Sequence, residues 1–252
     1  MRLTIVGCAG SFPSPASPAS CYLVQHEGTS IVLDLGNGSL GPLAGAIDLS
    51  AIDAVLLSHL HADHCLDLTS MYVARTYHPA GPPTSLLPVH APAGAARRIA
   101  EAYRTAPGQA EARLDRVFDF REFDSDPIRI GPFTITLVPV AHPVPTVAMR
   151  IEAGGRVLVY SGDTGPCEAL VAHARGADLA LFEAAFLTGQ SAPPNLHLTA
   201  AEAAEHAKRA GVPRLVLTHL VAWNDPRSTL AEAEAVFDGE LQLAASGMVL
   251  DL

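Results

Sequence analysis

The chain has 252 residues, of which 49% are hydrophobic and 17% charged, so it has ample material for a core and is not a disordered protein. Its formal net charge is −10 at pH 7, and Lys208 is its only lysine. Proteins that grip long nucleic acids usually carry a basic face, so this balance argues against a large polyanionic substrate. We expect one domain over residues 1–252.

The N-terminal segment enters an apolar strand at once, without the basic region and long apolar core of a signal peptide. No apolar run approaches the length of a membrane span. The four cysteines are scattered without a C-x-x-C pair, which favours free thiols in a reducing compartment. We therefore expect a cytoplasmic protein that does not enter the membrane.

The first half of the chain reads as strands followed by helices. Apolar patterning and turn residues predict strands over residues 3–6, 21–24, 30–35 and 54–57, with an irregular Pro/Ser/Ala loop over 12–20. The strands at 21–24 and 30–35 are expected to pair. Helical spacing predicts helices over residues 66–77 and 93–103.

The second half repeats this order. Strands are predicted over residues 133–140, 157–160, 179–182 and 215–217, the last clear core strand. Pro166 suits a first helical position, which predicts a helix over 166–175. Thr199 and Glu202 form a capping box for a helix that stops at Gly211, and a final helix is expected from Asp225 to about residue 237.

Two short segments echo each other. An apolar strand, a hydroxyl residue and a histidine occur at residues 55–59 and again at 215–219. A duplicated β-rich half with flanking helices suggests two sheets packed face to face with helices outside. The echo predicts that His59 and His219 lie at equivalent strand ends and face one shared site.

Residues 58–64 read Ser-His-Leu-His-Ala-Asp-His and follow a buried strand directly. Neutral imidazole and carboxylate suit zinc and similar first-row metals, and four such groups so close together can hardly all reach one ion. A strand end followed by a helix start would turn His59 and His61 one way and Asp63 and His64 another. The motif therefore predicts half-sites for two metals.

The H-x-H-x-D-H run resembles the signature of the metallo-β-lactamase superfamily, and the later motifs of that family follow in its order. The resemblance implies an α/β fold, an αββα sandwich of two mixed β-sheets with helices outside. It also implies that one metal takes His59, His61 and His142. The other takes Asp63, His64 and His219, and the resemblance makes Asp163 the bridge between the two.

Further residues narrow the branch of the superfamily. Exported β-lactamases need a signal that we do not find, and the broad-spectrum class has a cysteine where Asp163 stands. Glyoxalase II-type thioesterases add a helical domain, for which the 33 residues after His219 are too few. Glu183 with its Ala-Ala-Phe, and His197 with Leu-Thr, resemble elements of the ribonuclease Z branch, where the pair assists protonation at the scissile phosphate. A surface acid and a residue preceding a helix cap are the plainer interpretations of these two positions.

Ribonuclease Z itself carries a long arm between the metal motif that matches His142 and the bridging aspartate that matches Asp163, whereas these two residues are only 21 positions apart here. The whole run of motifs is similar to small bacterial cyclic-nucleotide phosphodiesterases of this fold. We therefore expect a phosphodiesterase with two divalent ions, zinc first, with manganese, iron or cobalt as alternatives. Asp63, Glu183 and His197 are its expected catalytic residues, and a small phosphodiester such as cyclic AMP is its expected substrate.

Two alternatives stay open: a ribonuclease Z-like nuclease acting on RNA 3′ ends, and a metal-binding sensor of the same fold without turnover. A homodimer also stays open. Trp223 or Phe12 could stack on the base of a nucleotide, or could pack inside. The remaining histidines match no motif and are assigned solvated or structural roles, with His206 expected on the wet face of its helix.

Overall fold

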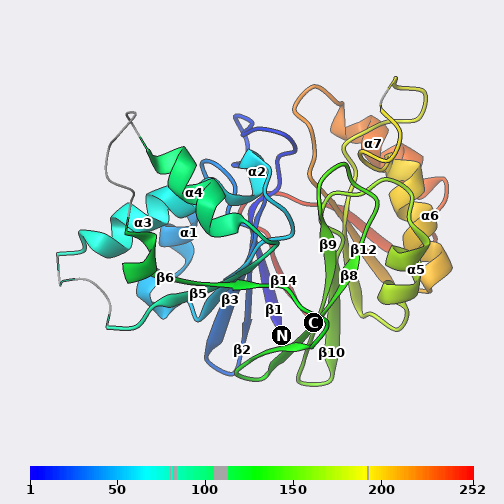
Figure 1. The fold of residues 1–252 in the computed structure, drawn as a ribbon. Coiled ribbons are helices and arrows are strands. Elements are labelled where there is room, and N and C mark those ends of the chain that lie inside the picture. Colours follow the sequence, from blue (N-terminus) through cyan, green and yellow to red (C-terminus); the bar gives the residue numbers. More distant parts are fainter. Residues whose placement is uncertain (80, 82–83, 105–112, 192) are drawn as a thin grey trace.

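A computed structural model describes residues 1–79, 81, 84–104, 113–191 and 193–252. Two seven-stranded sheets lie face to face, with helices on their outer sides (Figure 1). Both sheets are mixed, because each contains three parallel and three antiparallel pairings. The αββα sandwich predicted from the sequence is therefore confirmed.

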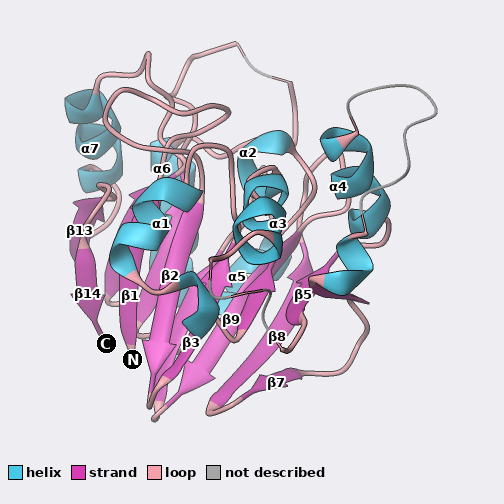
Figure 2. Cartoon of the chain, turned by 90° about the vertical axis from the view of Figure 1, so that its left-hand side faces the viewer, coloured by secondary structure: helices cyan, strands magenta, loops and turns pink. Residues whose placement is uncertain are grey.

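The first sheet joins the N-terminal half of the chain to its last strand, so that the two termini lie close together (Figures 1 and 2). Its order is β14 (Val249–Asp251), β1 (Arg2–Gly7), β2 (Cys21–His26), β3 (Thr29–Leu33), β4 (Ala54–Leu56), β5 (Leu87–Ala91) and β6 (Phe118–Glu122). The antiparallel pairing of β2 with β3 agrees with the expected hairpin.

The second sheet is built from the C-terminal half in a matching order. It runs β13 (Glu240–Leu243), β12 (Arg214–Thr218), β11 (Leu179–Glu183), β10 (Arg156–Tyr160), β9 (Val147–Ala153), β8 (Phe133–Pro139) and β7 (Ile128–Ile130). β4 and β12, the strands of the sequence echo, therefore lie inside opposite sheets.

Helices cover the outer face of each sheet (Figure 1). The first sheet is covered by α1 (Leu40–Ala46), α3 (Leu68–Thr76) and α4 (Ala95–Tyr103), while the short α2 (Ala62–Cys65) lies at its upper edge. The second is covered by α5 (Glu168–Ala174), α6 (Ala200–Ala210) and α7 (Pro226–Glu234). Two 3₁₀ turns occur at Leu49–Ala51 and Leu114–Arg116. No helix in the described ranges is long and apolar enough to cross a membrane.

The continuous apolar runs of β4 and β12 follow from burial on both faces. In β4, Leu56 packs in the core between the sheets while Val55 packs under the helices. In β12, Val216 faces the core between the sheets and Leu217 packs under the helices. A strand with two buried faces does not alternate with polar residues, which is why both runs stand out in the sequence.

Some elements differ from the sequence prediction. The helix expected from Pro166 begins only at Glu168. The preceding turn is held by other bonds, since Gly165 N–H donates to Ala141 O and Cys167 N–H to His206 Nε2. The helix expected over 66–77 is α3, which spans Leu68–Thr76, and the final helix ends at Glu234 rather than near residue 237. Sequence analysis did not place α1 and the strands β5, β6, β7, β9, β13 and β14.

Candidate metal centre

The histidine-rich motif lies at the carboxyl end of β4. His59 follows the strand in the buried connection, and the four-residue helix α2 carries Asp63 and His64. Gly36 allows this packing, because a Cβ at that position would lie 1.9 Å from the carbonyl oxygen of Asp63. The strand end and the short helix therefore point the two halves of the motif in different directions, as the sequence pattern predicted.

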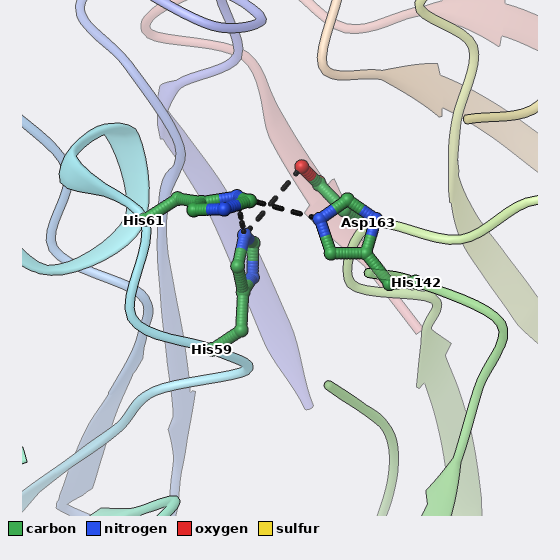
Figure 3. Close-up of side chains that lie close together, drawn as sticks. All are labelled: His59, His61, His142 and Asp163. Atoms are coloured by element: carbon green, nitrogen blue, oxygen red, sulfur yellow. Dashed lines mark hydrogen bonds and ion pairs between the residues drawn. The ribbon is translucent and has the colours of Figure 1, made fainter. Parts of the chain in front are cut away.

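One cluster combines the first half of the motif with residues of the opposite sheet. His59, His61, His142 and Asp163 bring one ligand atom each to within 4.8 Å of one another (Figure 3). Nδ1 of His61 lies 3.0 Å from Nε2 of His59 and 3.3 Å from Nε2 of His142. His142 follows β8 and Asp163 follows β10, so the cluster bridges the two sheets.

A second cluster combines Asp63, His64 and His219 with the same Asp163. Nε2 of His219 lies 3.1 Å from Oδ2 of Asp63 and 3.4 Å from Oδ2 of Asp163. Nε2 of His64 lies 3.2 Å from Oδ1 of Asp163. Asp163 is therefore the residue shared by two adjacent groups of four.

The chemistry of this donor set fits divalent metals. Within the described ranges, the buried His64 Nε2 and Asp163 Oδ1 have no hydrogen-bond partner, although they lie 3.2 Å apart. An unsatisfied buried polar atom is costly, and a cation between converging lone pairs would remove that penalty. Imidazole nitrogen and carboxylate oxygen are the donors that zinc and its first-row neighbours accept. The two clusters are compatible with a dinuclear site.

The electrostatics of the first cluster favour the protonation states that bind metal. Burial lowers the pKa of His59 well below its ordinary value and also lowers the pKa of His61 and His142. These rings are therefore neutral, which metal binding requires. Burial alone would raise the pKa of Asp163, but the surrounding histidines outweigh it and hold that pKa well below the usual range. Asp163 is consequently an anion at neutral pH.

Glu183 and His197, the other two predicted site residues, form a pair next to this centre. Glu183 ends β11 fully buried, and Nδ1 of His197 lies 2.9 Å from its Oε1. The backbone N–H groups of Thr164 and Ala185 also donate to the Glu183 carboxylate, at 2.8 and 3.2 Å. Glu183 is thus not a surface acid. Nδ1 of His197 also lies 3.8 Å from Oδ2 of Asp163, so the pair is adjacent to both clusters.

The pair retains a proton near neutral pH. Burial raises the pKa of the Glu183 carboxyl. Burial would lower the pKa of His197, but the Glu183 carboxylate beside it outweighs that effect and raises the pKa to about 9. The side chain of His197 is 10% exposed, so the ring is the part of the pair that opens toward solvent.

With this geometry established, comparison with known proteins identifies the family. A family model described as a beta-lactamase superfamily domain matches residues 29–220. The chain belongs to this superfamily. An uncharacterised protein of Mycobacterium leprae is 42% identical over 100% of this chain and 89% of that protein.

Two further relatives define the branch. A probable metallo-hydrolase of Bacillus subtilis, YhfI, is 32% identical over 99% of both chains. Its crystal structure superposes with a TM-score of 0.88 at 31% identity, over 99% of this chain and 98% of that one. A ribonuclease Z of Mycolicibacterium paratuberculosis is 31% identical over 88% of this chain and 86% of that protein. The chain is therefore a metallo-hydrolase of the superfamily with ribonuclease Z relatives, as the motifs predicted.

In this member of the superfamily, a fully buried carboxylate orients His64 of the second cluster, and sequence analysis gave it no site role. Oδ2 of Asp34 accepts hydrogen bonds from His64 Nδ1 at 2.8 Å, Ser58 Oγ at 2.8 Å and Tyr160 OH at 2.6 Å. Its Oδ1 accepts the Ser58 N–H at 2.6 Å. A hydrogen bond from the Nδ1 proton of a histidine fixes the tautomer in which Nε2 carries no proton, so that the lone pair of Nε2 is free to bind a metal ion. The available sequence signal was an acid directly after a buried strand.

His142 is oriented in the same way, because its Nδ1 donates to the carbonyl oxygen of Leu196 at 2.8 Å. The prediction for His206 was wrong. That side chain is 5% exposed, donates from Nδ1 to Glu202 O and accepts at Nε2 from Cys167 N–H. It faces inward because it links α6 to the turn before α5, which makes it a structural residue.

Proposed function

We propose that this chain is a metal-dependent phosphodiesterase that hydrolyses a small phosphodiester. The proposed substrate is a 3′,5′-cyclic nucleotide such as cyclic AMP, and the product is the 5′-monophosphate. Water adds to phosphorus, the bond from phosphorus to O3′ breaks, and O3′ leaves as a hydroxyl. The observation that carries the proposal is the buried Glu183–His197 pair beside the shared carboxylate of Asp163.

The ligand assignment is part of the proposal. His59, His61 and His142 would hold one divalent ion, and Asp63, His64 and His219 the other, with Asp163 shared. Zinc is the proposed metal, although manganese, iron and cobalt accept the same donors. Two such ions supply a water acidified into the neutral range and positive charge for the phosphoryl oxygens.

The chain's own residues supply the proton transfers. The pKa of Asp63 is lowered, because the hydrogen bond from His219 and the charge of the neighbouring His64 outweigh its burial, so this carboxylate is an acceptor that can orient the attacking water. Glu183 binds Nδ1 of His197, which leaves Nε2 as the ring nitrogen that can protonate O3′. General acid catalysis of this kind contributes about 10²- to 10⁴-fold.

The size and charge of the substrate follow from the surroundings of the site. A cyclic nucleotide carries one negative charge, which two metal ions can hold without a basic surface. The net charge of −10 is a poor match for the many phosphates of a transfer RNA. Residues 142–163 contain β9, β10 and short connections, so an extended arm does not occur between His142 and Asp163.

A second candidate function is cleavage of RNA 3′ ends, which the 31% identity to a ribonuclease Z favours. The deciding experiment offers metal-loaded protein cyclic AMP, cyclic GMP, a precursor transfer RNA and a β-lactam in parallel. We expect 5′-monophosphate from the cyclic nucleotides and no cleavage of the other two. Trimming of the precursor transfer RNA with inert cyclic nucleotides would reverse the assignment.

A further inference from the structure

Two large aromatic side chains are exposed side by side. Trp223, the only tryptophan of the chain, is 64% exposed and Phe12 is 41% exposed. Their ring centroids are 5.5 Å apart with an angle of 39° between the planes. Trp223 therefore does not pack inside the protein, and the two rings form one apolar surface, which we call the aromatic platform.

Both loops of the aromatic platform are attached to the segment that contains His219. Gly10 N–H donates to Leu220 O at 3.0 Å, and Ser11 N–H lies 3.3 Å from Nε2 of His219. Gly10 is required for this approach, because a Cβ there would lie 2.5 Å from His219 O. Phe12 follows Ser11 directly, so its backbone is one residue from the contact with His219 of the second cluster. Figure 1 shows both loops at the same end of the sandwich.

The loop of Trp223 is also fixed in place. Nδ2 of Asn224 donates to Ala185 O at 2.9 Å, and Oδ1 of Asn224 accepts from Gln190 Nε2 at 2.8 Å. Asp225 then caps α7 by accepting from Arg227 N–H at 3.0 Å. A large aromatic ring on a fixed frame, two residues from a helix cap, loses little conformational entropy when a flat ligand binds it.

We propose that the aromatic platform binds the base of the nucleotide whose phosphate lies at the metal centre. This inference rests on the proposed function and names its purine as the group recognised. Bases stack on aromatic side chains because every base has a π-face, and the contact needs no basic residue. That requirement matches an acidic chain whose platform is continuous with His219 through Ser11.

The test uses Trp223 as its own reporter, since no other tryptophan contributes to the fluorescence. Metal-loaded protein is titrated with adenosine 5′-monophosphate and, separately, with ribose 5-phosphate, which has the phosphate without the base. We expect adenosine monophosphate to quench the fluorescence and to bind about 5- to 150-fold more tightly than the sugar phosphate. Equal affinities, or no quenching at saturation by either compound, would overturn the proposal.

Variants show whether the two rings of the aromatic platform cause the tighter binding of adenosine monophosphate. Trp223→Ala and Phe12→Ala should each raise the dissociation constant for adenosine monophosphate, measured by calorimetry, and leave that for ribose 5-phosphate unchanged. Tyr77→Ala is the matched control, because that ring is 71% exposed at the far end of α3 and should change neither constant. Trp223→Phe, which keeps a ring, should restore most of the affinity.

The outcomes test base binding by the aromatic platform and the proposed phosphodiesterase activity separately. Selective binding of adenosine monophosphate by a protein that does not hydrolyse cyclic nucleotides would support the platform and refute the proposed function. Cyclic AMP hydrolysis with the same Michaelis constant in Trp223→Ala, Phe12→Ala and Tyr77→Ala would refute the platform alone. A dimer that becomes a monomer in Trp223→Ala, with unchanged nucleotide affinity, would assign the rings to a second copy of the chain and likewise refute it.

Discussion

Replacing Tyr160 with Phe removes one oxygen atom from the buried network behind the metal centre. Tyr160 is 1% exposed, and its hydroxyl donates to Oδ2 of Asp34 at 2.6 Å. The ring itself stays packed, with its centroid 5.0 Å from that of Tyr22, so the change creates little cavity. A hydrogen bond to a charged group contributes about 1.5–3 kcal/mol, and we expect the metal-free protein to lose that much stability.

The same change should weaken one metal site. Oδ2 of Asp34 also holds Nδ1 of His64, and His64 belongs only to the second cluster. Loss of a residue that orients a ligand lowers metal affinity by about 10- to 100-fold. Tyr160→Phe keeps Asp34 and removes only one of its hydrogen bonds, so we expect the lower end of that range. We therefore expect one of the two ions to bind more weakly in Tyr160→Phe while the other keeps its affinity.

Tyr22→Phe is the control for this prediction. Tyr22 OH hydrogen-bonds Oγ1 of Thr218 at 2.7 Å, so that variant also loses a buried hydroxyl. The hydrogen bond lost there joins two neutral groups, and such a bond contributes about 0.5–1.5 kcal/mol. Urea denaturation of the chelator-treated proteins measures stability, and competition with a chromophoric chelator measures the two affinities. Equal losses of stability in the two variants, with unaltered metal binding in Tyr160→Phe, would refute the role of Tyr160 in holding Asp34 against His64.

Three further predictions follow from the same geometry. Wild-type protein should bind two ions per chain by elemental analysis, and Asp163→Ala should reduce occupancy of both sites because Asp163 is common to the two clusters; saturation of the wild type at one ion would contradict this. Glu183→Ala and His197→Ala should each lower turnover of cyclic AMP, and the double variant should lose little more, since the two act as one unit; additive losses would show that they act separately. Thr199→Ala should cost about 1 kcal/mol in urea denaturation, because it removes the capping box of α6, with turnover unchanged.

The parts of the fold that could be predicted from sequence are those whose signal is local. β4 and β12 are short apolar runs, each followed by a hydroxyl residue and a histidine, so each could be recognised without knowing its neighbours. The capping box at Thr199 is equally local, and it is present as predicted. The order of the metal motifs added the long-range information that individual residues such as His142 lack.

The missed elements depend on partners far away in the chain. β14 has three residues and pairs with β1, more than 240 positions earlier. β13 begins with an exposed Glu240 and has no fully buried residue, so its pattern does not separate it from a loop. Asp34 escaped assignment for the same reason, because one of its donors, Tyr160, lies 126 positions later.

His206 shows a case in which the sequence held the signal and the interpretation was wrong. Ala203, Ala207 and Ala210 are buried on one face of α6, and His206 lies on that same face by helical spacing. A histidine was assumed to prefer water. The small alanines around it, however, leave room for an imidazole that satisfies both of its nitrogens.

The division between sheets and loops explains why the metal chemistry is easier to infer than the substrate. The predicted ligands lie at or just beyond strand ends in two sheets packed together, so their relative positions follow from a core that the apolar pattern specifies. Phe12 and Trp223 lie on loops, where the chain can change without loss of the core. Superfamily members can therefore share the residues of the metal centre and still act on different substrates. The residues that determine substrate specificity are then expected on the loops around the site.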